Sequence, residues 1–352
     1  MVIVNVNLTC RLLAIKHWKH ICFYSSSHEL GGCGGRAAGA GTSARNVWKN
    51  RFMKQAYVVN IPPSKTDLRC RAFTLADIPA AHGLSMALGW PYRPEDWQFS
   101  ADTATGFVAE ESGVVIGTAL CWKFGADRAS LGHVIVSSEH QGRGIGRKLM
   151  EAVLEELGPR ITFLHATPAG QPLYKKLGFS VCGSLEHYQG HVNKAFPVAL
   201  LDGERLRPGT PLDFPRLIEL ACRASGLERH ALLSALLKRG ESVMLERDGE
   251  IVGCSVLRRF GRGYVIGPVV ALRSRDDARA KALIGYWLTR QENEFVRIDV
   301  PAGTSLTDWL GDQGVKCVDV CSKMVRNAPA AAHSGAPDPV WRLYGLISQA
   351  ML

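Results

Sequence analysis

The sequence of 352 residues contains no run of about 18 apolar residues, so it predicts no helix that spans a membrane. Its ten cysteines also lack a zinc-binding pattern. Cys317 and Cys321, the closest pair, have three residues between them, and no matching CxxC or HxxxH motif lies elsewhere. Scattered cysteines in a chain of this length favour reduced thiols in a reducing compartment. We therefore expect a cytoplasmic protein without a metal site.

Acidic residues are scarce at the start of the chain, where residues 1–52 contain Glu29 alone against seven basic residues. This segment carries more than half of the net charge of +10, so the remainder is close to neutral for its size. The charge distribution therefore argues against a nucleic-acid partner. Two interpretations of residues 1–52 stay open: an organelle-targeting peptide, or a disordered or spurious extension upstream of a functional start at Met53.

From residue 67 onward the chain resembles an ordinary globular protein, with 46% apolar and 21% charged residues overall. The pattern of residues 67–195 predicts strands, a long amphipathic helix over 143–157 and a short helix after it. Residues 207–326 repeat this order, with Gly113 and Gly249 as anchors 136 positions apart. We predict a tandem duplication. A final helix over 341–352 is expected to dock through its apolar side chains: Trp341, Leu343, Leu346 and Ile347.

A glycine-rich turn between an apolar strand and the long helix is the segment most informative about chemistry. Residues 134–148 read VIVSSEHQGRGIGRK. Glycines let backbone N–H groups face a ligand, and the start of the following helix adds the positive end of its dipole. Together with Arg143 and Arg147, this arrangement predicts a site for a diphosphate-like anion, and a turn that only packs is the alternative. A dinucleotide fingerprint would need a third glycine and a P-loop would need Gly-Lys-Ser/Thr, so both are excluded.

The segment Gln141-x-x-Gly144-x-Gly146 matches the acyl-CoA signature of the GNAT superfamily of N-acetyltransferases. Residues 173–179 (LYKKLGF) look like the family's later tyrosine-containing helix, which Gly-Phe follows. The resemblance covers residues 67–190 and extends with lower specificity to 207–326. It implies an α+β fold of two GNAT-like domains in tandem, each a mixed, mostly antiparallel sheet flanked by helices. The first would be catalytic and the second degenerate.

The resemblance also implies that acetyl-CoA is the cosubstrate and that an amine attacks it directly in a ternary complex. Backbone groups of the strand would pair with the pantetheine arm and polarise the thioester carbonyl, and amides of the turn would hold the pyrophosphate. The residues implied for the cofactor are Val134, Ile135, Val136, Gln141, Gly142, Arg143, Gly144, Ile145, Gly146 and Arg147.

Tyr174 occupies the position where many family members keep a general acid, so it is the implied proton donor to the departing thiolate. The alternative is a tyrosine that packs in the core. No residue is singled out as the general base: His133, Glu110 and Glu139 are all open candidates, and water could also take the proton.

The acceptor is expected to be a small-molecule amine, bound beside an aromatic loop over residues 89–97. Trp90 and Trp97 would wall the site and Asp96 would attract an ammonium group, or the loop is a structural cap anchored by its tryptophans. A protein lysine is an alternative acceptor, and a non-catalytic acyl-CoA-binding or regulatory protein is the alternative function. We expect no nucleic-acid or membrane partner, and the sequence sets no oligomeric state.

The second repeat lacks the glycine turn. Residues 271–277 stand in its place, and Asp276 and Asp277 would repel phosphate. This half is therefore expected to bind no CoA.

Overall fold

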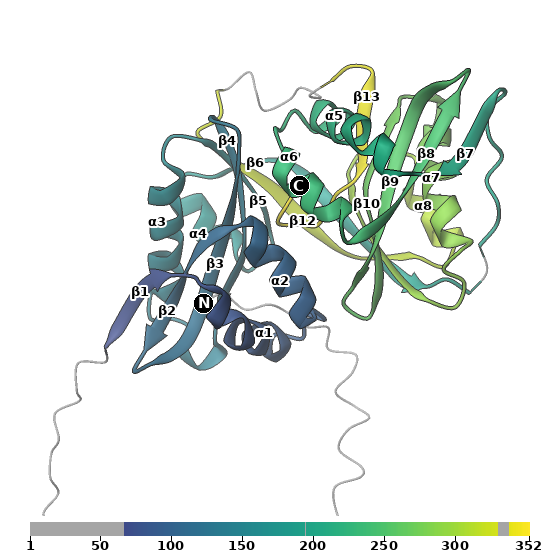
Figure 1. Cartoon of the computed structure of the whole chain (residues 1–352). Helices are drawn as coiled ribbons and strands as arrows, with labels where there is room; N and C mark the ends of the chain where they lie inside the picture. Colours follow the sequence, from purple (N-terminus) through teal and green to yellow (C-terminus); the bar gives the residue numbers. More distant parts are fainter. Residues whose placement is uncertain (1–66, 194, 330–337) are drawn as a thin grey trace, which may run out of the picture. The chain divides into compact units, whose positions relative to one another are not determined.

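The computed structural model describes residues 67–352 except for 194 and 330–337, so the segment 1–52 lies outside the described residues. The first repeat consists of β1 (Leu68–Ala72), α1 (Ile78–Ala87), α2 (Pro94–Thr103), β2 (Thr105–Glu111), β3 (Val114–Phe124), β4 (Arg128–Val136), α3 (Ile145–Leu157), β5 (Ile161–Ala166), α4 (Gln171–Lys176) and β6 (Ser180–His191). The second consists of β7 (Glu204–Pro208), α5 (Phe214–Ser225), α6 (His230–Leu237), β8 (Gly240–Arg247), β9 (Glu250–Phe260), β10 (Gly263–Leu272), α7 (Ala278–Leu288), β11 (Phe295–Pro301), α8 (Thr307–Asp312) and β12 (Lys316–Arg326). A further strand, β13 (Trp341–Gly345), follows (Figure 1).

The duplication extends to side-chain contacts. Arg71 donates hydrogen bonds to both carboxylate oxygens of Asp77, at 2.8 and 2.7 Å. Arg207 makes the same pair of bonds to Asp213 at the same distances, 136 positions later. In each repeat the aspartate also accepts the backbone N–H of a threonine three residues before it, which fixes the turn that leads into the first helix. The predicted tandem α+β architecture is therefore confirmed.

The sheet joins the two repeats by an exchange of strands. The order of the described strands is β1-β2-β3-β4-β5-β12-β6-β11-β10-β9-β8-β7. β12, from the second repeat, lies between β5 and β6 and is antiparallel to both, while β6 pairs on its other edge with β11 (Figure 1). The predicted boundaries at 67–195 and 207–326 thus separate the two repeats along the chain, but neither repeat completes its sheet with its own strands.

The predicted helix over 341–352 is wrong, because residues Trp341–Gly345 form β13, antiparallel to β10. β10 pairs with β11 only as far as Ile266 and Ile298, and beyond that point β13 takes the place of β11 beside β10. An unpaired strand edge binds an extended segment through main-chain hydrogen bonds, and this tertiary contact overrides local preference. Trp341, Leu346 and Ile347 are buried as expected.

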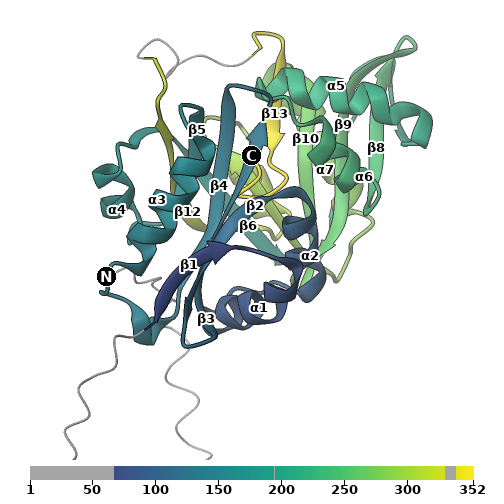
Figure 2. The ribbon, with the colours of Figure 1, turned by 60° about the vertical axis from the view of Figure 1, so that its left-hand side comes forward.

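Two apolar clusters lie against the first repeat. The buried face of α3 packs with Leu164 and Ala166 of β5. α1 and α2 belong to the other cluster, which also includes Trp122 and the last residues of the chain. Figure 2 shows α1 and α2 next to each other and apart from α3. Because successive residues of a strand point to opposite faces, β5 presents alternate side chains to the two clusters. No helix in the described ranges is long and apolar enough to cross a membrane.

Candidate active site

The glycine turn between β4 and α3 has the backbone that a ligand-binding loop needs. Gly142 and Gly144 have φ values of +81° and +78°, a region that disfavours residues with a side chain. A Cβ at either position would meet nothing within 4 Å, so the backbone is open on that side. The Gln141 amide donates to the main-chain oxygen of Val136 at 3.1 Å and ties the loop to the end of β4. The first amides of α3, which begins at Ile145, lack partners within the helix and can bind an anion.

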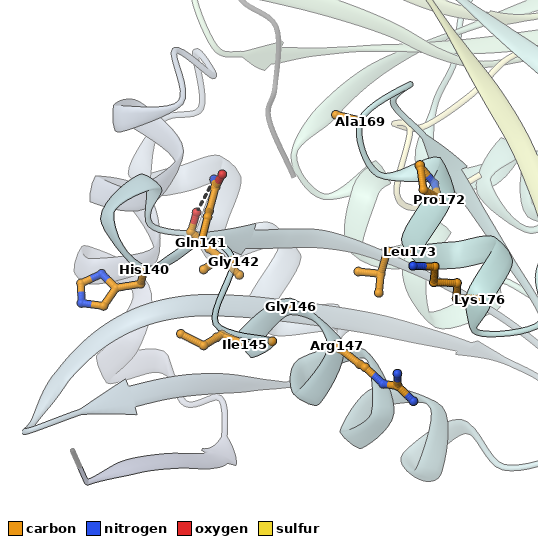
Figure 3. A pocket seen from close by; sticks show the side chains of 12 residues that line it. His140, Gln141, Gly142, Ile145, Gly146, Arg147, Ala169, Pro172, Leu173 and Lys176 are labelled. Carbon is orange, nitrogen blue, oxygen red and sulfur yellow. Dashed lines mark hydrogen bonds between the residues drawn. The ribbon is translucent and has the colours of Figure 1, made fainter. Parts of the chain in front are cut away.

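A cavity of about 310 Å³ lies between this loop and α4. Figure 3 shows Gln141 from the loop, Gly146 from the start of α3, and Leu173 and Lys176 from α4. Of the residues implied for the cofactor, those that line the cavity are Val136, Gln141, Gly142, Gly144, Ile145, Gly146 and Arg147. The loop, the helix start and the cavity therefore fit the diphosphate end of an acyl-CoA.

The two arginines that were expected to contribute positive charge to the anion site, Arg143 and Arg147, are paired with glutamates. Arg143 forms two hydrogen bonds, of 2.9 and 2.5 Å, with Glu111 on β2, so its charge is matched within the protein. Arg147 donates to Glu151 on the surface of α3 at 2.7 Å. Lys176 is exposed and lines the cavity, where its ammonium adds positive charge. Sequence reasoning missed Lys176, although a lysine in the last turn of the motif helix was a signal that could have indicated it.

β4 and β5 separate beside this cavity, as the resemblance implies. They pair in parallel from Arg128 and Ile161 to Ser130 and Phe163, and then diverge. β4 has an irregularity at His133, where φ is +51° and the register against β3 shifts. The split leaves the remaining main-chain groups of β4 on that edge available to an extended ligand. Val134 and Ile135 lie along this stretch, deeper than the loop.

Tyr174 is buried in α4, with its ring edge-on to Phe179 and 6.2 Å between the ring centroids. Burial raises the pKa of its phenol to about 12, so the group keeps its proton at neutral pH. Within the described residues, Tyr174 is not one of those that line the cavity. The contact with Phe179 matches the packing role, and the role as general acid stays a prediction.

The aromatic loop has the structural role that the sequence left open. Trp97 is fully buried, and its indole N–H donates to the Ser85 hydroxyl at 3.0 Å. Asp96 is 3% exposed and accepts hydrogen bonds from the backbone and guanidinium of Arg93 and from the backbone N–H of Gly261. Its charge is therefore already balanced, and the expectation that it attracts an ammonium group has no support in these contacts. Trp90 is half-buried against the same core.

Two of the three open candidates for the general base, His133 and Glu110, have internal contacts, and Glu139 is exposed. His133 is 5% exposed among aromatic rings, including those of Tyr92 and Trp97, and its Nε2 lies 3.2 Å from the Ser100 hydroxyl. Burial lowers the pKa of His133 to about 4. Glu110 is engaged by two arginines of β1.

In the second repeat, β10 and β11 separate as β4 and β5 do in the first, and β13 occupies the space between them. β13 pairs with β10 across the opening, and the Leu346 N–H donates to the main-chain oxygen of Asp299 on β11 at 2.9 Å. The turn before α7 carries Asp276 and Asp277 with φ values of 51° and 53°, and Asp277 accepts the backbone N–H of Ser305 at 2.7 Å. The occupied split between β10 and β11 and the acidic turn before α7 both support the expectation that the second repeat binds no CoA.

The fold and the site define a protein with two repeats of one acyl-CoA-binding architecture, of which the first alone has an open split and a glycine loop. Two family models match it: the acetyltransferase (GNAT) family over residues 76–179 and an acetyltransferase (GNAT) domain over residues 217–336. The chain belongs to the GNAT acetyltransferases, as a member with two GNAT domains in tandem.

Individual proteins support this assignment. The chain is 29% identical over 269 residues to the uncharacterized N-acetyltransferase YitH of Bacillus subtilis, a match over 75% of this chain and 91% of the relative. A putative acetyltransferase from Pyrococcus horikoshii shares the fold with a TM-score of 0.64 at 19% identity, over 81% of this chain and 96% of that one. A tandem GNAT protein from the clavulanic acid biosynthesis pathway matches with a TM-score of 0.58 at 16% identity, over 75% of this chain and 100% of its own.

Proposed function

We propose that this chain is a cytoplasmic N-acetyltransferase that uses acetyl-CoA to acetylate the amine of a small molecule. One observation carries the proposal: the split between β4 and β5 leads into a glycine loop whose open backbone borders a cavity. This combination provides main-chain partners for an extended arm and an anion site at its end. The second repeat has neither.

When bound, acetyl-CoA supplies an activated acetyl group. In the proposal, the amides of the loop and of the first turn of α3 hold the diphosphate, with Lys176 adding a positive charge beside them. A backbone N–H of β4 near Ile135 or Val136 donates to the carbonyl oxygen and stabilises the negative charge that develops there. The Tyr174 phenol, which burial keeps protonated, gives its proton to the sulfur.

Two measurements test the proposal together. We expect acetyl-CoA at tens of micromolar to raise the melting temperature of the protein beginning at Met53, because a ligand that binds the folded state alone stabilises it. We also expect free thiol to appear when an amine library is added. Absence of a thermal shift well above micromolar concentrations would remove the cofactor assignment. A shift without thiol release from any small amine or peptide would favour the non-catalytic alternative.

A further inference from the structure

Two basic side chains lie on the face of the β4–β5 split that is turned away from α3. His165 is on β5, two residues past Phe163, where the pairing with β4 ends. Leu164 and Ala166 belong to the cluster of α3, and Phe163 packs against the opposite cluster, so the alternation of the strand places His165 on the opposite face. Lys323 of β12 is the direct cross-strand partner of His165 and therefore shares that face. The site is thus composed of residues from both repeats.

The end of the chain orients His165. After β13 the segment 346–352 passes over the split, where the Ser130 hydroxyl donates to the main-chain oxygen of Ala350 at 2.7 Å. The main-chain oxygen of Gln349 accepts a hydrogen bond from Nδ1 of His165 at 2.6 Å. Because Nδ1 carries the proton, Nε2 of the neutral ring has a free lone pair. Burial lowers the pKa of His165 to about 4, so the neutral ring is the form present near pH 7.

Burial lowers the pKa of the Lys323 ammonium, and among the described residues no carboxylate forms an ion pair with it. Its ammonium lies 5.2 Å from the centroid of the Phe163 ring, and the β6 residue that pairs with it is Gly183, which has no side chain to cover it. The buried carboxylate on this side of the sheet, Asp299, is held by Arg297 at 2.9 Å. A half-buried cation of this kind attracts an anionic group of a ligand.

We propose that this face is the acceptor site and that it selects amines that also carry a carboxylate, such as amino acids. Lys323 binds the carboxylate, and Nε2 of His165 receives a proton from the amine nitrogen. Paired residues on neighbouring strands have Cβ atoms about 5 Å apart, a span that an amino acid bridges. This inference rests on the acetyl transfer proposed above.

The step balances. The amine nitrogen forms a bond to the acetyl carbon while the carbon–sulfur bond breaks. The proton lost by nitrogen goes to His165, and the sulfur leaves with the bonding electron pair and takes a proton from Tyr174.

Matched acceptors test the selectivity. Phenylalanine with phenethylamine, and lysine with cadaverine, each differ by one carboxylate. We expect wild-type protein to favour the amino acid by at least about tenfold in kcat/KM, the scale of one charge-assisted hydrogen bond. Lys323→Met is expected to abolish this ratio, and Lys323→Arg to retain part of it, with the KM for acetyl-CoA unchanged in both. Lys175→Met, on the exposed side of α4, is the matched control and should retain the full ratio.

A second readout needs no turnover. Calorimetric titration of the preferred amino acid into protein without acetyl-CoA should give binding that Lys323→Met weakens by about tenfold and Lys175→Met does not change. His165→Asn should lower kcat for both members of a pair by about a hundredfold while the carboxylate ratio persists.

The outcomes separate the two proposals. Turnover with no preference for the carboxylate, or an equal loss for both acceptors in Lys323→Met, overturns the acceptor class and leaves acetyl transfer in place. Absence of both acetyl-CoA binding and thiol release overturns the proposed function, and the acceptor class with it.

Discussion

Nδ1 of His165 lies 2.6 Å from the main-chain oxygen of Gln349, a residue 184 positions further along the chain. A carbonyl oxygen can only accept, so the imidazole must donate from Nδ1. We expect His165 to be the Nδ1–H tautomer at pH 7, and the ¹⁵N chemical shifts of its ring to show an unprotonated Nε2. The His165→Asn variant identifies the signals. An Nε2–H tautomer would remove the lone pair on which the acceptor proposal depends.

Replacement of Gly146 by aspartate should separate cofactor binding from folding. Gly146 is the second residue of α3, and a Cβ there meets Val136 and Leu173 at 3.6 and 3.8 Å, which is ordinary contact. A carboxylate near a helix N-terminus stabilises the helix, but it repels a diphosphate. We expect Gly146→Asp to melt no lower than wild type and to bind acetyl-CoA at least about a hundredfold more weakly. Gly146→Asn, of equal size and neutral, is the control and should lose far less affinity by calorimetry.

Removal of the Tyr174 hydroxyl tests the proton donor. Tyr174→Phe keeps the ring that packs against Phe179, so the melting temperature should stay close to that of wild type. If the phenol protonates the leaving sulfur, kcat should fall by about a hundredfold and the KM for acetyl-CoA should change little. Tyr286→Phe, on α7, supplies the control. Unchanged thiol release in Tyr174→Phe would assign this tyrosine to packing alone.

The exchange of β12 and β6 predicts that the repeats do not fold separately. Residues 67–195 alone would expose the edges of β5 and β6 that β12 covers, and unpaired edges promote aggregation. We expect this fragment to lack a cooperative unfolding transition and to elute as aggregates. Co-expression with residues 196–352 should restore a soluble complex, whereas a monomeric, cooperatively unfolding fragment would show that the exchange is not required.

Burial of His133 predicts that stability falls in mild acid. Its pKa is about 4 in the folded protein and 6.5 in the reference state, so between these values the unfolded chain binds the additional proton. The free energy of unfolding should therefore rise with pH over this window and level off above it. One such histidine contributes at most about 1.4 kcal/mol per pH unit.

Denaturant titrations between pH 4.5 and 7 measure this slope. His133→Phe, which keeps an aromatic ring among Tyr92 and Trp97, should reduce it by up to that amount. His230→Gln, at an exposed position, should leave it unchanged. The same slope in His133→Phe as in wild type would assign the pH dependence to other groups.

The sequence by itself determined the duplication and the glycine loop, and it predicted an anion site there, because each depends on local chemistry. A left-handed turn needs glycine at positions such as Gly142 and Gly144, and the amides of α3 follow from the start of a helix. These features stand within a few residues of one another, so spacing alone reveals them.

Only the tertiary structure decided which edges and charges find partners. β13 is a strand because β10 and β11 diverge, and Arg143 is neutralised because Glu111 lies beside it. Asp96 accepts the backbone N–H of Gly261, 165 positions further along the chain, instead of facing a ligand. The proposed acceptor face joins His165 of one repeat to Lys323 of the other, and Gln349 accepts a hydrogen bond from His165. Hydrogen bonds and ion pairs between residues more than a hundred positions apart depend on strand order, which local preferences do not specify.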